Sequence, residues 1–177
     1  MTNQHVVELR SADVTDAHMV FGFIRALAAF QGLTHEVRIT EEILRQRMAP
    51  DASPQLYVII AEVGGVPVGM AIYFLSFSTF LGTWGIHVED MYVEEQYRKK
   101  GLGRAFFFSL ARIAGEHGYA RIEFSVLESN VNARRLYEET LGARPLSEWV
   151  PMRIDGDALS RLIERPEEVG VRKFRPH

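Results

Sequence analysis

The segment that most constrains this chain is the glycine- and cation-rich stretch at residues 97–106, YRKKGLGRAF. A β-rich run at residues 85–93 precedes it and an amphipathic pattern over residues 102–115 follows it, so it is predicted to join a strand to a helix. The first N–H groups of a helix lack internal partners, and the helix dipole favours negative charge there. Gly101 and Gly103 let an anion approach the backbone. The segment therefore predicts a pyrophosphate-binding loop.

Three kinds of phosphate loop compete for this segment. A nucleotide-triphosphatase loop needs Gly-Lys-Ser/Thr, whereas here the lysines precede the glycines. A dinucleotide-binding fingerprint needs a third small residue where this chain has Phe106, and a bulky ring would block close packing of helix and strand. The third kind, Arg/Gln-x-x-Gly-x-Gly/Ala, is matched in full by residues 98–103. A helix start with a solvated, charged lead-in is the plainer alternative.

Composition limits the classes of protein that remain. The chain has 177 residues, 47% of them apolar, which suits one globular domain, predicted over residues 1–177. A net charge of −3 argues against a nucleic-acid partner. Because there is no cysteine, disulfides, thiolate metal sites and a cysteine acyl-enzyme are excluded. The histidines lack metal-ligand spacing, so we expect no metal. Without a membrane-length apolar stretch or a signal-peptide pattern, a cytoplasmic protein with no membrane partner is expected.

Hydrophobic periodicity predicts the order of the elements. We expect strands at residues 5–10, 55–63, 66–77, 85–93 and 121–126, with two last strands at 145–148 and 149–154. We expect helices ending near residue 30 and spanning 41–48, 102–115, 133–141 and about 155–163. Residues 165–177 are charged and contain proline, and they are predicted to be a surface tail or interface arm. This order predicts an α/β fold, with one central mixed sheet and helices on both faces.

The phase of the strand at residues 85–93 predicts a β-bulge. Ile86 and Val88 are apolar on one parity, whereas Met91 and Val93 are apolar on the other. One extra residue at 89–90 would move the later side chains to the opposite face. Bulges are common beside active sites, where they redirect side chains. The alternative is a regular strand without a bulge.

Taken together, these features resemble the GNAT superfamily of N-acetyltransferases. The 98–103 loop is similar to the superfamily's coenzyme A loop, and Asn130-x-x-Ala133-x-x-x-Tyr137 is similar to its second cofactor segment. The order of elements is also that of the GNAT fold, whose sheet is largely antiparallel. Within the superfamily the chain is close to the diamine acetyltransferases, which are the spermidine/spermine and thialysine enzymes, at residues 88–93, 97–103, 126–130, 136–137, 141–143 and 149–155. It departs from them at Lys99 and Lys100, where smaller or aromatic residues are common.

The resemblance implies an activity and a set of partners. It implies direct transfer of an acetyl group from acetyl-CoA to a primary amine of a small polyamine-like substrate in a ternary complex. It also implies a homodimer. Acetylation of another amine, such as an amino acid, an aminoglycoside or a peptide, is an alternative. A non-catalytic module that binds acyl-CoA is another.

The site residues follow from the same reasoning. Tyr137 is the candidate proton donor to the leaving thiolate, and Glu89 is the candidate base, acting directly or through water. A core tyrosine and a solvated carboxylate are the plainer interpretations of these two residues. The resemblance implies cofactor contacts by Met91, Tyr92, Val93, Arg98, Lys99, Lys100, Gly101, Leu102, Gly103, Arg104, Asn130, Ala133 and Tyr137. It also implies that the cationic amine is held by Glu36, Asp90, Glu148 and Trp149.

Overall fold

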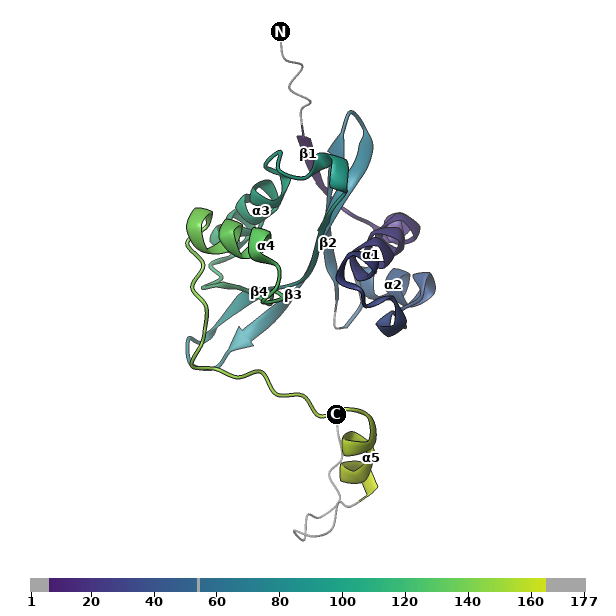
Figure 1. Ribbon diagram of the computed structural model, residues 1–177, viewed down its shortest axis with the longest axis vertical. Coiled ribbons are helices and arrows are strands. Elements are labelled where there is room, and N and C mark those ends of the chain that lie inside the picture. The colour runs from purple at the N-terminus through teal and green to yellow at the C-terminus, as the bar shows by residue number, and fades with distance from the viewer. Residues whose placement is uncertain (1–6, 54, 165–177) are drawn as a thin grey trace. The chain divides into compact units, whose positions relative to one another are not determined.

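A five-stranded sheet forms the centre of the first of two compact units, Met1–Leu141 and Gly142–His177. The computed structural model describes residues 7–53 and 55–164, so the predicted tail at 165–177 lies outside the described residues. The strands lie side by side in sequence order (Figure 1). Four pair antiparallel and the last joins in parallel: β1 (Val7–Ser11), β2 (Tyr57–Val63), β3 (Val66–Ser78), β4 (Thr83–Val93) and β5 (Ile122–Phe124). The predicted mixed, largely antiparallel sheet is confirmed.

Helices cover both faces of this sheet, as predicted (Figure 1). One face carries η1 (Val14–Asp16), α1 (Ala17–Gln31), η2 (Thr34–Glu36) and α2 (Glu41–Met48). The short turn η3 (Glu95–Tyr97) follows β4, and the other face carries α3 (Leu102–His117), α4 (Val131–Arg135) and the π-helical turn η4 (Leu136–Thr140). Two buried apolar clusters, one on each face, account for the stability of this layered arrangement.

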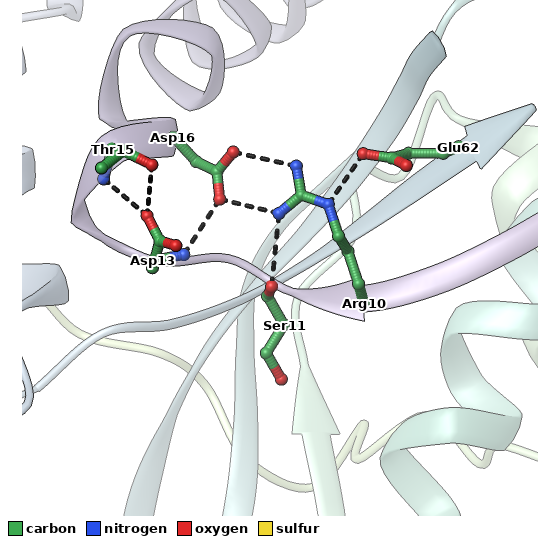
Figure 2. A network of polar contacts seen from close by, with 6 residues as sticks. All are labelled: Arg10, Ser11, Asp13, Thr15, Asp16 and Glu62. Carbon is green, nitrogen blue, oxygen red and sulfur yellow. Dashed lines mark hydrogen bonds and ion pairs between the residues drawn. The ribbon is translucent and has the colours of Figure 1, made fainter. Parts of the chain in front are cut away.

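The N-terminal strand is tied to the first helix by a charged network (Figure 2). Arg10 donates two hydrogen bonds to the carboxylate of Asp16, at 2.8 and 2.9 Å, and its Nε donates to Glu62 of β2 at 2.7 Å. Asp13 accepts from the backbone N–H of Thr15 at 2.7 Å, while Asp16 accepts from the backbone N–H of Asp13 at 2.9 Å. This capping box fixes the chain where it leaves β1 and enters the helical segment.

The predicted bulge is present in β4. Ile72 of β3 lies opposite Asp90, and the next residue, Tyr73, lies opposite Val88. Glu89 is therefore the extra residue, and the side chains that follow it are displaced to the opposite face. The parity change in the sequence predicted this bulge at residues 89–90, and the register of β3 and β4 confirms it.

The second unit differs from its prediction. Its helix α5 (Gly156–Glu164) forms where it was expected. However, the predicted strands at residues 145–148 and 149–154 are wrong, because neither joins a ladder in the described residues. The backbone N–H of Trp149 donates to the Leu146 carbonyl at 3.0 Å, which forms a turn instead of a ladder. Alternating apolar residues do not make a strand without a neighbouring strand to accept their hydrogen bonds.

Candidate active site

A cavity of about 1120 Å³ opens where β4 and β5 part. β5 pairs with β4 only from Ile86 to Val88, and β4 then continues for five residues to Val93 without it. All residues that line the cavity belong to the first unit. They come from the end of α1, the second half of β4, the loop into α3, the segment after β5, and α4 with η4. The freed edge of β4 can hydrogen-bond an extended ligand as an added strand would.

The cavity brings together most of the predicted site residues. Glu89 and Asp90 line it, and so does every residue predicted to contact the cofactor: Met91, Tyr92, Val93, Arg98, Lys99, Lys100, Gly101, Leu102, Gly103, Arg104, Asn130, Ala133 and Tyr137. These residues come from β4, the loop, and the α4–η4 segment, which are far apart in the sequence. Their convergence on one cavity is what a ligand as long as coenzyme A requires.

The loop before α3 has the geometry of an anion site. Gly101 has a φ of +90°, and a Cβ on it would meet no heavy atom within 4 Å, so the space above it is open. No side chain caps the helix that starts at Leu102, so its first N–H groups lack side-chain acceptors. Gly103 lets α3 approach η4, because a Cβ there would lie 3.1 Å from Leu136 Cδ2. Lys99 takes a left-handed φ of +60°, which is uncommon outside glycine.

The Arg98 side chain makes contacts to two other elements of the protein. Its Nε donates to the Val93 carbonyl at 2.9 Å. Its guanidinium carbon lies 4.5 Å from the centroid of the Phe30 ring and 5.7 Å from that of Tyr92. Arg98 also lines the cavity, so it links the loop to β4 and α1 and adds a positive charge to the cavity wall.

The Tyr137 ring packs against the rings of two phenylalanine residues. Its ring packs edge-on against Phe124 at 4.7 Å and Phe107 at 5.3 Å between centroids, and those two rings contact each other at 5.0 Å. It lies in the π-helical turn closed by the hydrogen bond from Leu141 N to Leu136 O. Burial raises the pKa of the Tyr137 phenol above its ordinary value. The phenol is therefore protonated at neutral pH, the state in which it can donate a proton.

The two neighbouring carboxylates in the bulge have different environments. Asp90 is largely buried, and this burial, with a smaller contribution from the charge of Glu89, raises its pKa to about 6. The Glu89 side chain is 58% exposed, and its Oε2 lies 3.9 Å from His87 Nε2. Asp90 thus has the environment of a cation-binding or proton-accepting group as clearly as Glu89 does, whereas the sequence analysis assigned Glu89 as the base and Asp90 as a ligand of the amine.

Some predicted residues are not part of this cavity. Glu36 lies in η2 with a side chain 64% exposed, and it is not among the lining residues. Glu148 and Trp149 belong to the second unit, so their contact with the amine stays a prediction. Asn130 lines the cavity, but its Oδ1 also caps α4 by accepting from Ala133 N at 3.2 Å. Within residues 7–53 and 55–164, no group of three or more histidines and carboxylates is arranged to hold a metal ion.

Comparison with known proteins decides the family. A family model described as the acetyltransferase (GNAT) family matches residues 23–143. The chain belongs to the GNAT acetyltransferase family. The predictions of a GNAT fold and of an acetyl-transferring enzyme are thereby confirmed. In the described part of the chain, no helix has both the length and the apolar composition needed to cross a membrane.

Relatives agree with the diamine acetyltransferase resemblance. A thialysine N-epsilon-acetyltransferase of Mus musculus is 32% identical over 176 residues, covering 93% of this chain and 100% of the mouse protein. An L-ornithine N5-acetyltransferase of Arabidopsis thaliana is 32% identical over 130 residues, covering 73% of this GNAT chain and 53% of the plant protein. A solved acetyltransferase from Clostridium acetobutylicum, described with acetyl-CoA, has the same fold, with a TM-score of 0.70, 20% identity and coverage of 84% and 97%.

Proposed function

We propose that this GNAT enzyme transfers the acetyl group of acetyl-CoA directly to a primary amine of a small, polyamine-like substrate. The observation that carries the proposal is the convergence of the open Gly101 loop, the free edge of β4 and Tyr137 on one cavity. A cofactor with a pyrophosphate at one end and a thioester at the other fits that order of groups. The solved relative described with acetyl-CoA supports the choice of donor.

The loop would hold the charged end of the donor. Backbone N–H groups at the start of α3 point positive partial charge at a pyrophosphate, and Lys99, Lys100 and Arg104 add full charges around the same wall. The amides of the donor's pantetheine arm would pair with the freed edge of β4 at Met91 to Val93. Asn130 and Ala133 would contact the arm from α4 on the other side.

The reaction would remove two protons from the nitrogen, one before the attack and one after the N–C bond forms, and supply one proton to the sulfur. Glu89 would accept the proton of the substrate ammonium, directly or through water, which leaves a neutral amine as the nucleophile. As the new N–C bond forms and the C–S bond breaks, a backbone N–H at Met91 would stabilise the carbonyl oxygen and Tyr137 would protonate the departing thiolate. The second proton from the nitrogen would go to the Tyr137 phenolate, directly or through water, which restores the phenol. No covalent intermediate on the protein is required when both substrates bind together.

The proposed acceptor is an amine with a second cationic group. Asp90 places a partly buried carboxylate in the cavity wall, and this burial makes its attraction to a cation stronger than in water. Contacts of Glu148 and Trp149 with the amine stay predictions, and Glu36 does not line this cavity. The relatives are named for transfer to side-chain nitrogens of thialysine and ornithine, which are substrates of the same class. We further propose a cytoplasmic homodimer.

A panel of amines tests this function. Thiol release from acetyl-CoA would be measured with spermidine, thialysine and ornithine, with an aminoglycoside and with a peptide. 1,4-Diaminobutane and butylamine form a matched pair that differs by one amine. We expect kcat/KM at least about tenfold higher for the diamine, since one ionic contact to a partly buried carboxylate contributes more than about 1.4 kcal/mol. Faster turnover of the aminoglycoside or peptide would contradict the substrate class, and no release with any amine would contradict an enzymatic role.

A further inference from the structure

Phe30 is an exposed aromatic residue that does not belong to the buried face of its own helix. It lies in the last turn of α1 with its side chain 56% exposed, and it borders the cavity. The buried face of α1 is formed by other residues, namely Ala17, Val20, Phe23, Leu27 and Ala28. An exposed aromatic ring therefore adds little to the packing of α1 on the sheet. Its close contact is the Arg98 guanidinium, 4.5 Å above the ring centroid.

That contact joins three separate elements. Arg98 begins the segment at residues 98–104, called here the 98–104 loop, which includes the first residues of α3. Its Nε is bound to the carbonyl of Val93 at the end of β4, and its guanidinium plane lies against Phe30 on α1. The start of the loop is thus fixed at two points, by a hydrogen bond to β4 and by a cation–π contact to α1.

We propose that Phe30 is a positioning residue for the 98–104 loop, which it holds against α1 by way of Arg98. This inference rests on the proposed function, in which the loop receives the pyrophosphate of the donor. A phenylalanine ring has no N–H or O–H group to offer a phosphate. Its effect on the charged end of the donor must therefore pass through Arg98, which fixes where the loop begins.

A double-mutant cycle on coenzyme A affinity tests this coupling. An exposed cation–π contact contributes about 0.5–1 kcal/mol, so Phe30→Leu should raise the Kd for coenzyme A about two- to fivefold. Phe30→Tyr keeps a ring face and should restore wild-type affinity. In an Arg98→Met background, Phe30→Leu should have no further effect. An unchanged Kd in Phe30→Leu would overturn the proposal, and an equal loss in both backgrounds would show that the ring touches the ligand directly.

A second measurement needs no ligand. Amide hydrogen exchange of residues 99–104 in the free protein should be faster in Phe30→Leu and restored in Phe30→Tyr, because the loop has lost one of its two anchors. Phe80→Leu is the control, since Phe80 is 96% exposed. Unchanged exchange in Phe30→Leu would contradict the inference. Failure of the wild type to bind coenzyme A would contradict the proposed function, so the two failures are distinguishable.

Discussion

At the scale of single residues, Tyr137 combines a protonated phenol with a fixed position. Replacing it with phenylalanine keeps the ring contacts to Phe107 and Phe124 and removes only the hydroxyl. We expect kcat to fall about 100-fold or more, since general-acid catalysis contributes roughly that much, while the Kd for coenzyme A stays the same. The measurement is steady-state kinetics with a titration of coenzyme A.

Tyr119→Phe is the matched control for that experiment. Tyr119 is a partly buried tyrosine that packs on the core cluster beside α3 and is not among the residues lining the cavity. Its loss of a hydroxyl should leave kcat unchanged. If Tyr137→Phe also kept kcat within about twofold of wild type, the proton donor would have to be another group.

The ionised side chain of Asp90 lowers the stability of the fold, so its effect on the free energy of unfolding depends on pH. Its pKa is raised from 3.8 to about 6, so folding favours the protonated form. The stability that this preference contributes is complete below pH 4 and is lost as the pH rises through 6. Asp90→Asn should therefore stabilise the fold at pH 8 by up to about 3 kcal/mol and have little effect at pH 4. The measurement is urea unfolding at both pH values.

The same substitution should weaken recognition of the amine. Because Asp90→Asn replaces a carboxylate with an uncharged amide, we expect a higher KM for diamines and a smaller change for a monoamine. Glu89→Gln is the matched control for stability, since that side chain is mostly exposed. An equal loss of stability from Asp90→Asn at pH 4 and pH 8 would show that the carboxylate is structurally required, contrary to this account.

At the scale of elements, the Arg10 network joins β1, β2 and the start of the α1 segment. Arg10→Met would leave the Asp16 and Glu62 carboxylates, with side chains only 13% and 17% exposed, without their cation. We expect a loss of about 1–2 kcal/mol in the free energy of unfolding at pH 7. Arg10 lowers the pKa of Asp16, so its stabilisation is present above pH 4 and lost as the pH falls further.

Arg45→Met gives the control for this network. Arg45 pairs with Glu41 and Glu42 on the surface of α2 within one helix turn, where an ion pair contributes about 0.5 kcal/mol or less. The two variants should thus differ in urea denaturation at pH 7. Equal losses in the free energy of unfolding would mean that the bidentate contact of Arg10 stabilises the fold no more than a surface ion pair does.

The elements that sequence predicted best are those governed by local chemistry. Thr40 is of a residue type that favours helix N-caps, and it caps α2 by accepting from Ile43 N at 3.2 Å. The Gly64-Gly65 pair takes φ values of +60° and +76°, as a tight hairpin between β2 and β3 requires. The bulge at Glu89 was also predictable, because side-chain parity is a local signal. The turn that joins β4 to α3 at residues 98–103 was predictable for the same reason, and its role in binding pyrophosphate stays a prediction.

What sequence missed depends on contacts between distant segments. The helix expected at residues 133–141 is divided into α4 and a π-helical turn, which propensity alone does not distinguish. The segments expected to be strands after residue 145 have no neighbouring strand within residues 7–53 and 55–164. The contact of Arg98 with Phe30 joins residues 68 positions apart, so the motif alone assigned Arg98 only to the cofactor.

At the scale of the whole molecule, the first unit places three features along one cavity. They are the cationic loop before α3, the free edge of β4 and the phenol of Tyr137. In the part of the chain that the structure describes, β5 leaves β4 after Val88, and the residues proposed for each step of an acetyl transfer line the opening. Family membership gives the reaction, and the cavity supports a particular donor. The central claim is therefore that this opening is the acetyl-CoA site.

Calorimetric titration of coenzyme A into the wild type and a Gly101→Val variant tests that claim most directly. A Val side chain would fill the open space above the loop and strain a backbone at φ +90°. We predict one coenzyme A bound per chain in the wild type and at least about tenfold weaker binding in the variant, with thermal unfolding measured to confirm that it folds. No binding to the wild type, or equal binding to both proteins, would contradict the account.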